Sequence, residues 1–408
     1  MSANTCSSTL LPAELTDAVI DMLADDSTTL KSCSLVCRLW RIRSQYCLLS
    51  TLKLSQHTPL RNLAERLAHP LLTGYISHIH LDPAFLPPTF WDAFGKIMPH
   101  LPAFNSVSFK SKQMCKVQPE AWDIFTRYSS TIQSLAFGNI IFDTLCAFTK
   151  FLNGFPHITS LYVEYVTWGS ALTPAERQLP PRKLTSLREL HLYYCTERAE
   201  FTRWLLNECP PDDHDGILLN AKLPIKSLCL TWHERTSKLQ NALNILGPRL
   251  EHLSLPPKIS SAARHIPLED PGPILDLSVL ENLKTLVICS DNITRYKEDN
   301  STFTSLSRML TTLTSPHISK ITFALKTPIT FVDPISDKPS WNLIDAALSH
   351  PHLLSRLRTV EVQCPLPACV SECGMMRAEA ARRLREELLP KTGREKGLLV
   401  VCAIEGKA

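Results

Sequence analysis

One pattern of apolar and polar positions recurs along most of the chain. It reads apolar-x-x-apolar-x-apolar, as in "TIQSLAF" ending at residue 137 and "SLRELHL" ending at residue 192. Alternation with a period of two predicts a short β-strand whose last two apolar side chains point to one face. The middle apolar position of the pattern falls at residues 52, 79, 107, 135, 161, 190, 228, 253, 286, 321 and 360.

The segments between these strands predict helices. "QPEAWDIFTRYSS" and "DTLCAFTKFLNGFP" are two examples. A strand and helix of this size cannot bury their own apolar face, so successive units must stack on one another. The first spacings, 26 to 29 residues, are close to those of leucine-rich repeats. Residues 49–364 resemble leucine-rich-repeat proteins, which implies an α/β solenoid with a curved parallel sheet and outer helices.

The later part of this region departs from a regular repeat. Insertions lengthen the units at residues 207–216, 256–273 and 326–339, and the consensus Asn or Cys after the strand is clear only at Cys195. We therefore expect the units to stack on one another with irregular curvature.

Residues 365–408 are expected to close the solenoid. Met376, Ala380, Leu384 and Leu388 form one apolar side of a predicted helix, and "LLVVCAI" predicts a final strand. Solenoid ends need such caps. The alternative is a basic docking helix.

Residues 10–48 follow a different pattern. Pro12 suits the first turn of a helix, in which Leu15, Val19, Met22 and Leu23 form one face and Ile20 another. Asp26 or Ser27 is the predicted N-cap of a second helix, which contains "LKSCSLVCRLW" at residues 30–40. That helix would be apolar on nearly all sides and therefore must be covered on nearly all sides. Because about forty residues cannot enclose a strong core, we expect the first repeat to cover one side and a second polypeptide the other.

This segment resembles an F-box, particularly the versions in large fungal F-box families. The resemblance implies docking onto a Skp-type adaptor and, through it, onto a cullin–RING ubiquitin ligase. The repeats would then hold an unknown protein substrate. An N-terminal helical cap on the solenoid is the alternative interpretation. The positions that carry the resemblance, and that it implies contact the adaptor, are Leu11, Pro12, Leu15, Ile20, Leu23, Leu30, Val36, Cys37 and Trp40.

Composition and charge limit the classes of partner and the cellular compartment that we expect for this protein. With 43 basic and 39 acidic residues, the net charge of +4 does not favour a nucleic-acid partner. No apolar stretch approaches the ~20 residues of a membrane span. The first nine residues are expected to be disordered. The N-terminal stretch "MSANTCSSTLLPAEL" has no basic region and no long apolar core, so it does not predict a secretory signal. Most of the 14 cysteines stand at apolar positions of periodic segments, so we expect reduced thiols and a cytoplasmic or nuclear protein.

The sequence lacks the motifs of common enzymes. No glycine-rich phosphate loop, G-x-S-x-G, H-E-x-x-H or C-x-x-C occurs. Cys364, Cys369 and Cys373 lack a fourth ligand at matching distance for zinc. His78 and His80 lie two residues apart on one strand face, where ordinary exposed polar residues are the favoured interpretation. We therefore predict no enzyme, no cofactor and no metal.

The strand face opposite the apolar pairs is the remaining place for recognition. Seven of its eleven first positions are Ser or Thr, which an exposed sheet also explains. Tyrosines are enriched where interfaces concentrate their binding energy. We therefore hypothesise that the substrate contacts the middle of this face. The cluster there comprises Tyr162, Glu164, Glu189, His191 and Tyr193.

The overall prediction is a non-catalytic substrate receptor of a Skp–cullin–F-box ubiquitin ligase. The alternative is a leucine-rich-repeat scaffold or interaction protein with no role in ubiquitination. A third possible class of function is a receptor for a lipid or small molecule, which would need a pocket in the solenoid.

Overall fold

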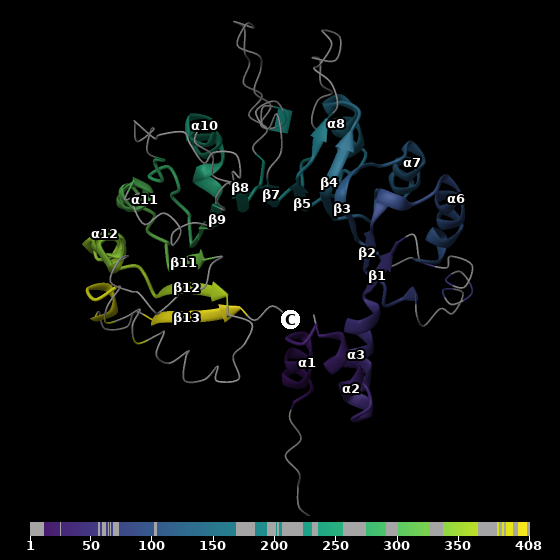
Figure 1. Ribbon diagram of the computed structural model, residues 1–408, viewed down its shortest axis with the longest axis horizontal. Coiled ribbons are helices and arrows are strands. Elements are labelled where there is room, and N and C mark those ends of the chain that lie inside the picture. Colours follow the sequence, from purple (N-terminus) through teal and green to yellow (C-terminus); the bar gives the residue numbers. More distant parts are fainter. Residues whose placement is uncertain are drawn as a thin grey trace, which may run out of the picture. The chain divides into compact units, whose positions relative to one another are not determined.

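Figure 1 shows the computed structural model. It divides into two compact units, of which the first ends at residue 136 and the second begins at residue 137. The boundary falls inside strand β4 (Ser134–Phe142). The described residues are 12–24, 26–55, 58, 63, 65, 67, 73–101, 104–168, 184–193, 201, 204–205, 223–230, 236–255, 275–290, 301–325, 338–365, 382, 386, 389–394 and 399–405.

The first unit begins with three helices and continues with strand–helix repeats. Its helices are α1 (Ala13–Asp21), α2 (Ser27–Cys33), α3 (Arg38–Leu49), α6 (Pro88–Ile97) and α7 (Pro119–Arg127). Its strands are β1 (Thr51–Leu54), β2 (His78–Leu81) and β3 (Ser106–Lys116), and short 3-10 turns η1 (Pro83–Phe85) and η2 (Met98–His100) flank α6.

The strands β1, β2 and β3 pair in parallel and in chain order. The predicted middle positions align, since Leu52 lies opposite Ile79 and Ile79 opposite Val107. Ile79 and Val107 are buried. Beneath them the ring of Phe125 from α7 lies 5.1 Å from that of Phe109, between centroids. Burial of these strand and helix side chains holds each repeat against the next.

The second unit continues the same alternation. Its strands after β4 are β5 (Ser160–Glu164), β6 (Thr167–Trp168), β7 (Glu189–Tyr193), β8 (Ser227–Leu230), β9 (His252–Leu255), β10 (Thr285–Ser290), β11 (Lys320–Leu325), β12 (Thr359–Pro365) and β13 (Leu399–Glu405). Its helices are α8 (Leu145–Asn153), α10 (Thr236–Leu246), α11 (Ser301–Thr311), α12 (Lys338–Leu348) and α13 (Pro351–Leu354), with 3-10 turns η4 (Gly247–Arg249) and η6 (Thr392–Arg394).

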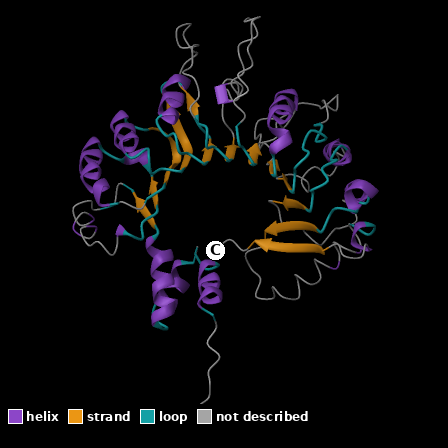
Figure 2. Ribbon diagram, turned by 180° about the vertical axis from the view of Figure 1, so that it is seen from behind, coloured by secondary structure: helices purple, strands orange, loops and turns teal. Residues whose placement is uncertain are grey.

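The sheet of the second unit confirms the solenoid prediction. From β4 to β13 the strands are hydrogen-bonded in chain order, except β6, which pairs with β4 instead. The register places Leu161 opposite Leu190, and each later predicted middle position opposite the next. Figure 2 shows that the helices of this unit lie on one side of the strands. Stacking therefore continues past residue 190, although the three predicted insertions lie almost entirely outside the described residues.

A repeated backbone contact fixes this register. In most repeats, the carbonyl of the residue immediately before the strand accepts hydrogen bonds from two N–H groups of the following repeat. The carbonyl of Lys226 accepts from Glu251 and His252, and that of Glu251 accepts from Lys284 and Thr285, at 2.8–3.1 Å. Because both donors are consecutive residues, a slip by one position would break the pair.

The last described strand continues the parallel sheet. Strand β13 pairs with β12, with Val400 opposite Val360, which confirms the predicted final strand. Most of the predicted capping helix, including its four apolar positions, lies outside the described residues. The carboxylate of Asp345 in α12, which is buried, accepts hydrogen bonds at 2.9 Å from the backbone N–H groups of Lys391 and Thr392.

The N-terminal helices differ from the prediction at one point. Residues 30–40 are not a single helix, because α2 ends at Cys33 and Cys37 is extended before α3 begins. The intervening turn is closed by hydrogen bonds from Leu35 and Val36 to carbonyls three residues earlier. Because the helix is broken, some of the apolar residues of this segment lie in a turn between α2 and α3. No single helix therefore has to be covered on every side.

The predicted start signals of the first two helices are largely confirmed. The Asp26 side chain caps α2 by accepting from the N–H groups of Thr28 and Thr29, the interaction expected of an N-cap. Pro12 stands one position earlier than predicted, as the N-cap of α1. Across the described part of the chain, no helix combines the length and apolar character needed to cross a membrane.

Candidate functional site

The three N-terminal helices, called the arm below (residues 12–49), have a small interior. Ile20 of α1 is 0% exposed, Leu30 of α2 is 1% exposed, and Cys33 is buried with them. The prediction that Ile20 and Leu30 leave exposed apolar surface for a partner is therefore wrong. Both side chains are used to pack the helices on one another, since a unit this small has few other residues for its core.

Most of the arm's other large apolar side chains are exposed. Twelve large apolar residues are exposed among the described residues, and eight of them belong to the arm. Leu15 and Val19 of α1 and its C-cap residue Met22 follow one helix face at spacings of four and three, and Leu35 and Val36 lie in the turn before α3. The face of α3 that is exposed carries Leu39, Ile42 and Tyr46. This concentration is unusual for surface that meets only water.

The remaining predicted adaptor positions have mixed environments. Pro12 and Cys37 are exposed, whereas Leu23 and Trp40 are half-buried. Leu11 lies outside the described residues. The resemblance omitted six of the eight exposed apolar residues of the arm, although helical spacing alone places Val19 and Met22 beside Leu15.

One ion pair fixes α1 against α3. The Arg43 guanidinium donates to both carboxylate oxygens of Asp21, and its carbon lies 4.9 Å from the centre of the Tyr46 ring. The hydrogen bond from Arg43 lowers the pKa of Asp21. A two-point contact of this kind sets orientation as well as distance, so the exposed faces of α1 and α3 are held in a fixed relation.

A second candidate site lies on the open face of the sheet, meaning the side away from the helices. The register brings the five predicted residues together on β5 and β7: Tyr162 pairs with His191, and Glu164 with Tyr193. The ring centroid of Tyr162 lies 5.8 Å from that of His191 and 5.2 Å from that of Tyr193. Both tyrosines are half-buried on this face rather than in the core.

Hydrogen bonds order the two tyrosines. The Tyr162 hydroxyl donates to Glu164 Oε2 at 2.8 Å, and the Cys229 thiol of β8 donates to the Tyr193 hydroxyl at 2.8 Å. Burial is the main reason that the pKa of each tyrosine is raised, so both phenols stay protonated. Burial also lowers the pKa of His191, despite the opposing effect of Glu189. The imidazole is therefore uncharged at neutral pH.

A third tyrosine, which the sequence did not single out, adjoins this cluster. Tyr165 follows β5 with a φ of 49°, a left-handed conformation that costs a non-glycine residue about 1–2 kcal/mol. Its N–H donates to the carbonyl of Tyr193 at 3.0 Å, which compensates for the conformation. No pattern in the sequence predicts a positive φ at a tyrosine.

The histidine pair on β2 contacts the neighbouring strand. His80 Nδ1 lies 3.3 Å from Ser108 Oγ on the next strand, and burial lowers the pKa of both His78 and His80. Within the described residues no three His, Cys, Asp or Glu side chains are grouped as metal ligands.

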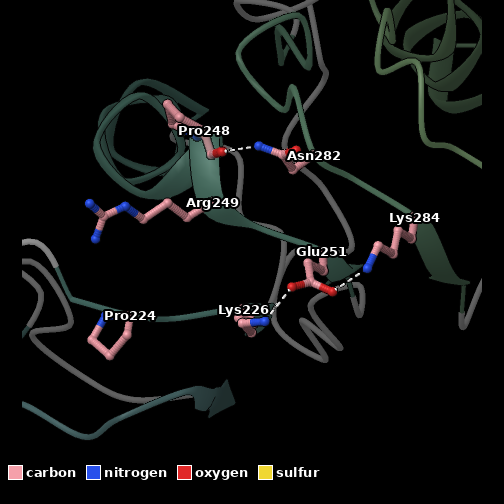
Figure 3. Close-up of a pocket in the computed structure, with 7 residues that line it drawn as sticks. All are labelled: Pro224, Lys226, Pro248, Arg249, Glu251, Asn282 and Lys284. Atoms are coloured by element: carbon pink, nitrogen blue, oxygen red, sulfur yellow. Dashed lines mark hydrogen bonds and ion pairs between the residues drawn. The ribbon is translucent and has the colours of Figure 1, made fainter.

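A hollow of about 340 Å³ lies where three repeats of the second unit meet, before strands β8, β9 and β10 (Figure 3). Glu251 bridges Lys226 and Lys284 across it, each at 2.6 Å. These two lysines lower the pKa of Glu251 to about 2. Because Glu251 already pairs with both lysines, we interpret the hollow as a seam between repeats. Its lining comprises Pro224, Lys226, Pro248, Arg249, Glu251, Asn282 and Lys284.

Comparisons with known proteins add no family assignment. No profile of a known protein family and no curated protein matches the sequence. Among solved structures, the chain is similar to one chain of the crystal structure of the Rad7 and Elc1 complex in yeast. The TM-score is 0.40 and the identity 12%, over 95% of this chain and 92% of that one. The repeat fold described above is established by strand order and register, independently of this likeness.

Proposed function

We propose that this chain is a non-catalytic substrate-receptor subunit of a Skp–cullin–F-box ubiquitin ligase. In this proposal the arm docks the Skp-type adaptor, the adaptor connects the chain to a cullin, and the repeats hold a protein substrate. The observation that carries the proposal is the exposed apolar surface of the arm, on a segment whose sequence resembles an F-box.

The energetics favour a partner on this surface. Burying one leucine-sized side chain contributes about 1.5–3 kcal/mol. Leu15, Val19 and Met22 on α1, together with Leu35 and Val36 in the turn, are all exposed. A second chain that covered even part of this set would gain several such contributions, whereas the arm's own interior is already filled by Ile20 and Leu30.

The first experiment measures binding to a purified recombinant Skp-type adaptor. The double variant Val19→Asp with Leu35→Asp should bind at least about 30-fold more weakly, because it introduces two charges into the proposed apolar contact. Both residues are exposed, 51% and 81% respectively, so the fold should be retained.

A matched control is available in the second unit. Ile245 of α10 and Leu343 of α12 are also exposed apolar residues on helices, 50% and 37% exposed. The double variant Ile245→Asp with Leu343→Asp should leave adaptor binding unchanged. Equal losses in both double variants, or no binding by the unmodified chain, would remove the adaptor proposal and leave the helical-cap interpretation.

A second experiment separates the receptor from the scaffold alternative. A cullin added to the chain–adaptor complex should be retained with it on size exclusion. Retention of the adaptor without the cullin would favour an interaction protein with no role in ubiquitination.

A further inference from the structure

Carboxylates on the open face of the second unit fall into two groups. Glu361 of β12 forms an ion pair with Lys320 at 2.6 Å. Glu164 and Glu189 instead make no ion pair with any cation among the described residues. Glu189 is exposed and Glu164 is half-buried. Two carboxylates that form no ion pair with a described residue therefore lie on adjacent strands.

Aromatic rings lie between these two carboxylates. On β5 the outward residues run Ser160, Tyr162, Glu164, and on β7 they run Glu189, His191, Tyr193, in register. Glu164 thus stands at one end of the Tyr162 and His191 pair, and Glu189 at the other. Within the described part of the chain, the charge that influences the pKa of His191 is that of Glu189.

The chemistry of this arrangement suits a positive group. Aromatic faces attract lysine and arginine side chains, most strongly where water is partly excluded. The neutral imidazole of His191 does not repel a cation, and the hydrogen bond from Tyr162 orients the Glu164 carboxylate. An anionic ligand would be repelled by the two carboxylates, and no described cationic side chain of this cluster would offset that repulsion.

We propose that the Tyr162, His191 and Tyr193 rings, flanked by Glu164 and Glu189, bind a lysine or arginine side chain of a protein segment lying on the open face. This site gives the substrate of the proposed receptor a chemical class. It rests on that function only in assigning the bound segment as substrate, because the binding itself does not involve the arm.

The test uses the full chain without adaptor and a fluorescein-labelled peptide, acetyl-Gly-Ser-Lys-Lys-Lys-Ser-Gly-amide. Fluorescence polarisation should show saturable binding. The same peptide with its lysines Nε-acetylated, which removes the charge but keeps the length, should bind much more weakly. Glu164→Gln should weaken binding of the charged peptide by about fivefold, the upper end of the range for loss of one partner of an ion pair at a protein surface.

Matched variants separate this site from the general charge of the protein. Glu361→Gln also removes a carboxylate from this sheet face, but that carboxylate is already paired with Lys320. This variant should therefore leave peptide binding unchanged. Tyr162→Phe keeps the ring and should retain binding within about threefold, whereas Tyr162→Leu should lose it. Melting curves of each variant confirm folding. Glu164→Gln remains decisive if Tyr162→Leu does not fold.

Three results would overturn the proposal. These are no binding of the charged peptide up to millimolar concentration, equal binding of the acetylated peptide, or equal losses in Glu164→Gln and Glu361→Gln. Adaptor binding should be unchanged in all these variants, so failure here and failure of the adaptor proposal give different patterns.

Discussion

The arm and the repeats use apolar residues in opposite ways. In the repeats, the inward side chains of each strand, such as Leu161 and Leu286, are fully buried by their own repeat and the next. In the arm, Met22 and Leu35 are 87% and 81% exposed. The difference arises because every repeat has a neighbour that supplies its missing surface, whereas three short helices bury one interior and leave their other apolar faces uncovered.

This contrast shows what an apolar pattern alone can mean. Periodic apolar positions predict the side that must be covered, but they do not identify what covers it. In the repeats the cover is the next repeat. In the arm the cover is, by our proposal, another polypeptide.

The largest expected effect tests the contrast directly. Leu286→Ala should lower the free energy of unfolding by about 3 kcal/mol, since it leaves a cavity in a closely packed sheet core. Leu35→Ala removes the same atoms from an exposed turn and should change the free energy of unfolding by less than about 0.5 kcal/mol. Urea denaturation followed by circular dichroism measures both. Similar losses would mean that the arm's turn is packed in solution.

A second pair of variants sharpens the comparison inside one helix. Ile20 and Val19 are adjacent in α1, but Ile20 is fully buried and Val19 is exposed. Ile20→Ala should destabilise the arm by about 2 kcal/mol, detected as faster amide hydrogen exchange in α1 and α3. Val19→Ala should leave exchange unchanged while weakening adaptor binding. The reverse pattern would contradict the assignment of the two faces.

The smallest effect concerns the charged seam between repeats. The pKa of Glu251 is lowered from 4.5 to about 2 by Lys226 and Lys284. Its stabilising contribution is therefore complete above pH 4.5 and is lost as the pH falls from about 4.5 to about 2. Over that interval the melting temperature of Glu251→Gln should fall less steeply than that of the unmodified chain. The difference should shrink in high salt, and parallel curves at low salt would exclude a role for the ion pairs.

Much of the repeat region was predictable because its signal is repeated. A single apolar-x-x-apolar-x-apolar stretch is weak, but the middle positions from Leu161 to Val360 recur and then lie opposite one another in the sheet. Short-range alternation determines which side chains point inward. The parallel register follows because equivalent positions of stacked units align.

The cluster on β5 and β7 was predictable in membership but not in detail. Alternation placed Tyr162 and His191 on the outward face, and equivalent strand positions placed them side by side. The Cys229 contact with Tyr193 and the positive φ of Tyr165 depend on side-chain packing across strands far apart in sequence, which no local pattern encodes.

In the arm, the sequence by itself determined that helices form, where α1 and α2 begin, and that apolar residues exceed what so short a segment can bury. Only the tertiary structure decided which of them become interior. The turn at residues 34–37 redirects the chain, so Leu30 packs inward with Ile20 while Leu35 and Val36 face solvent. The physical reason is that local spacing determines which residues share a face of a helix, whereas burial depends on which of those faces packs against another helix.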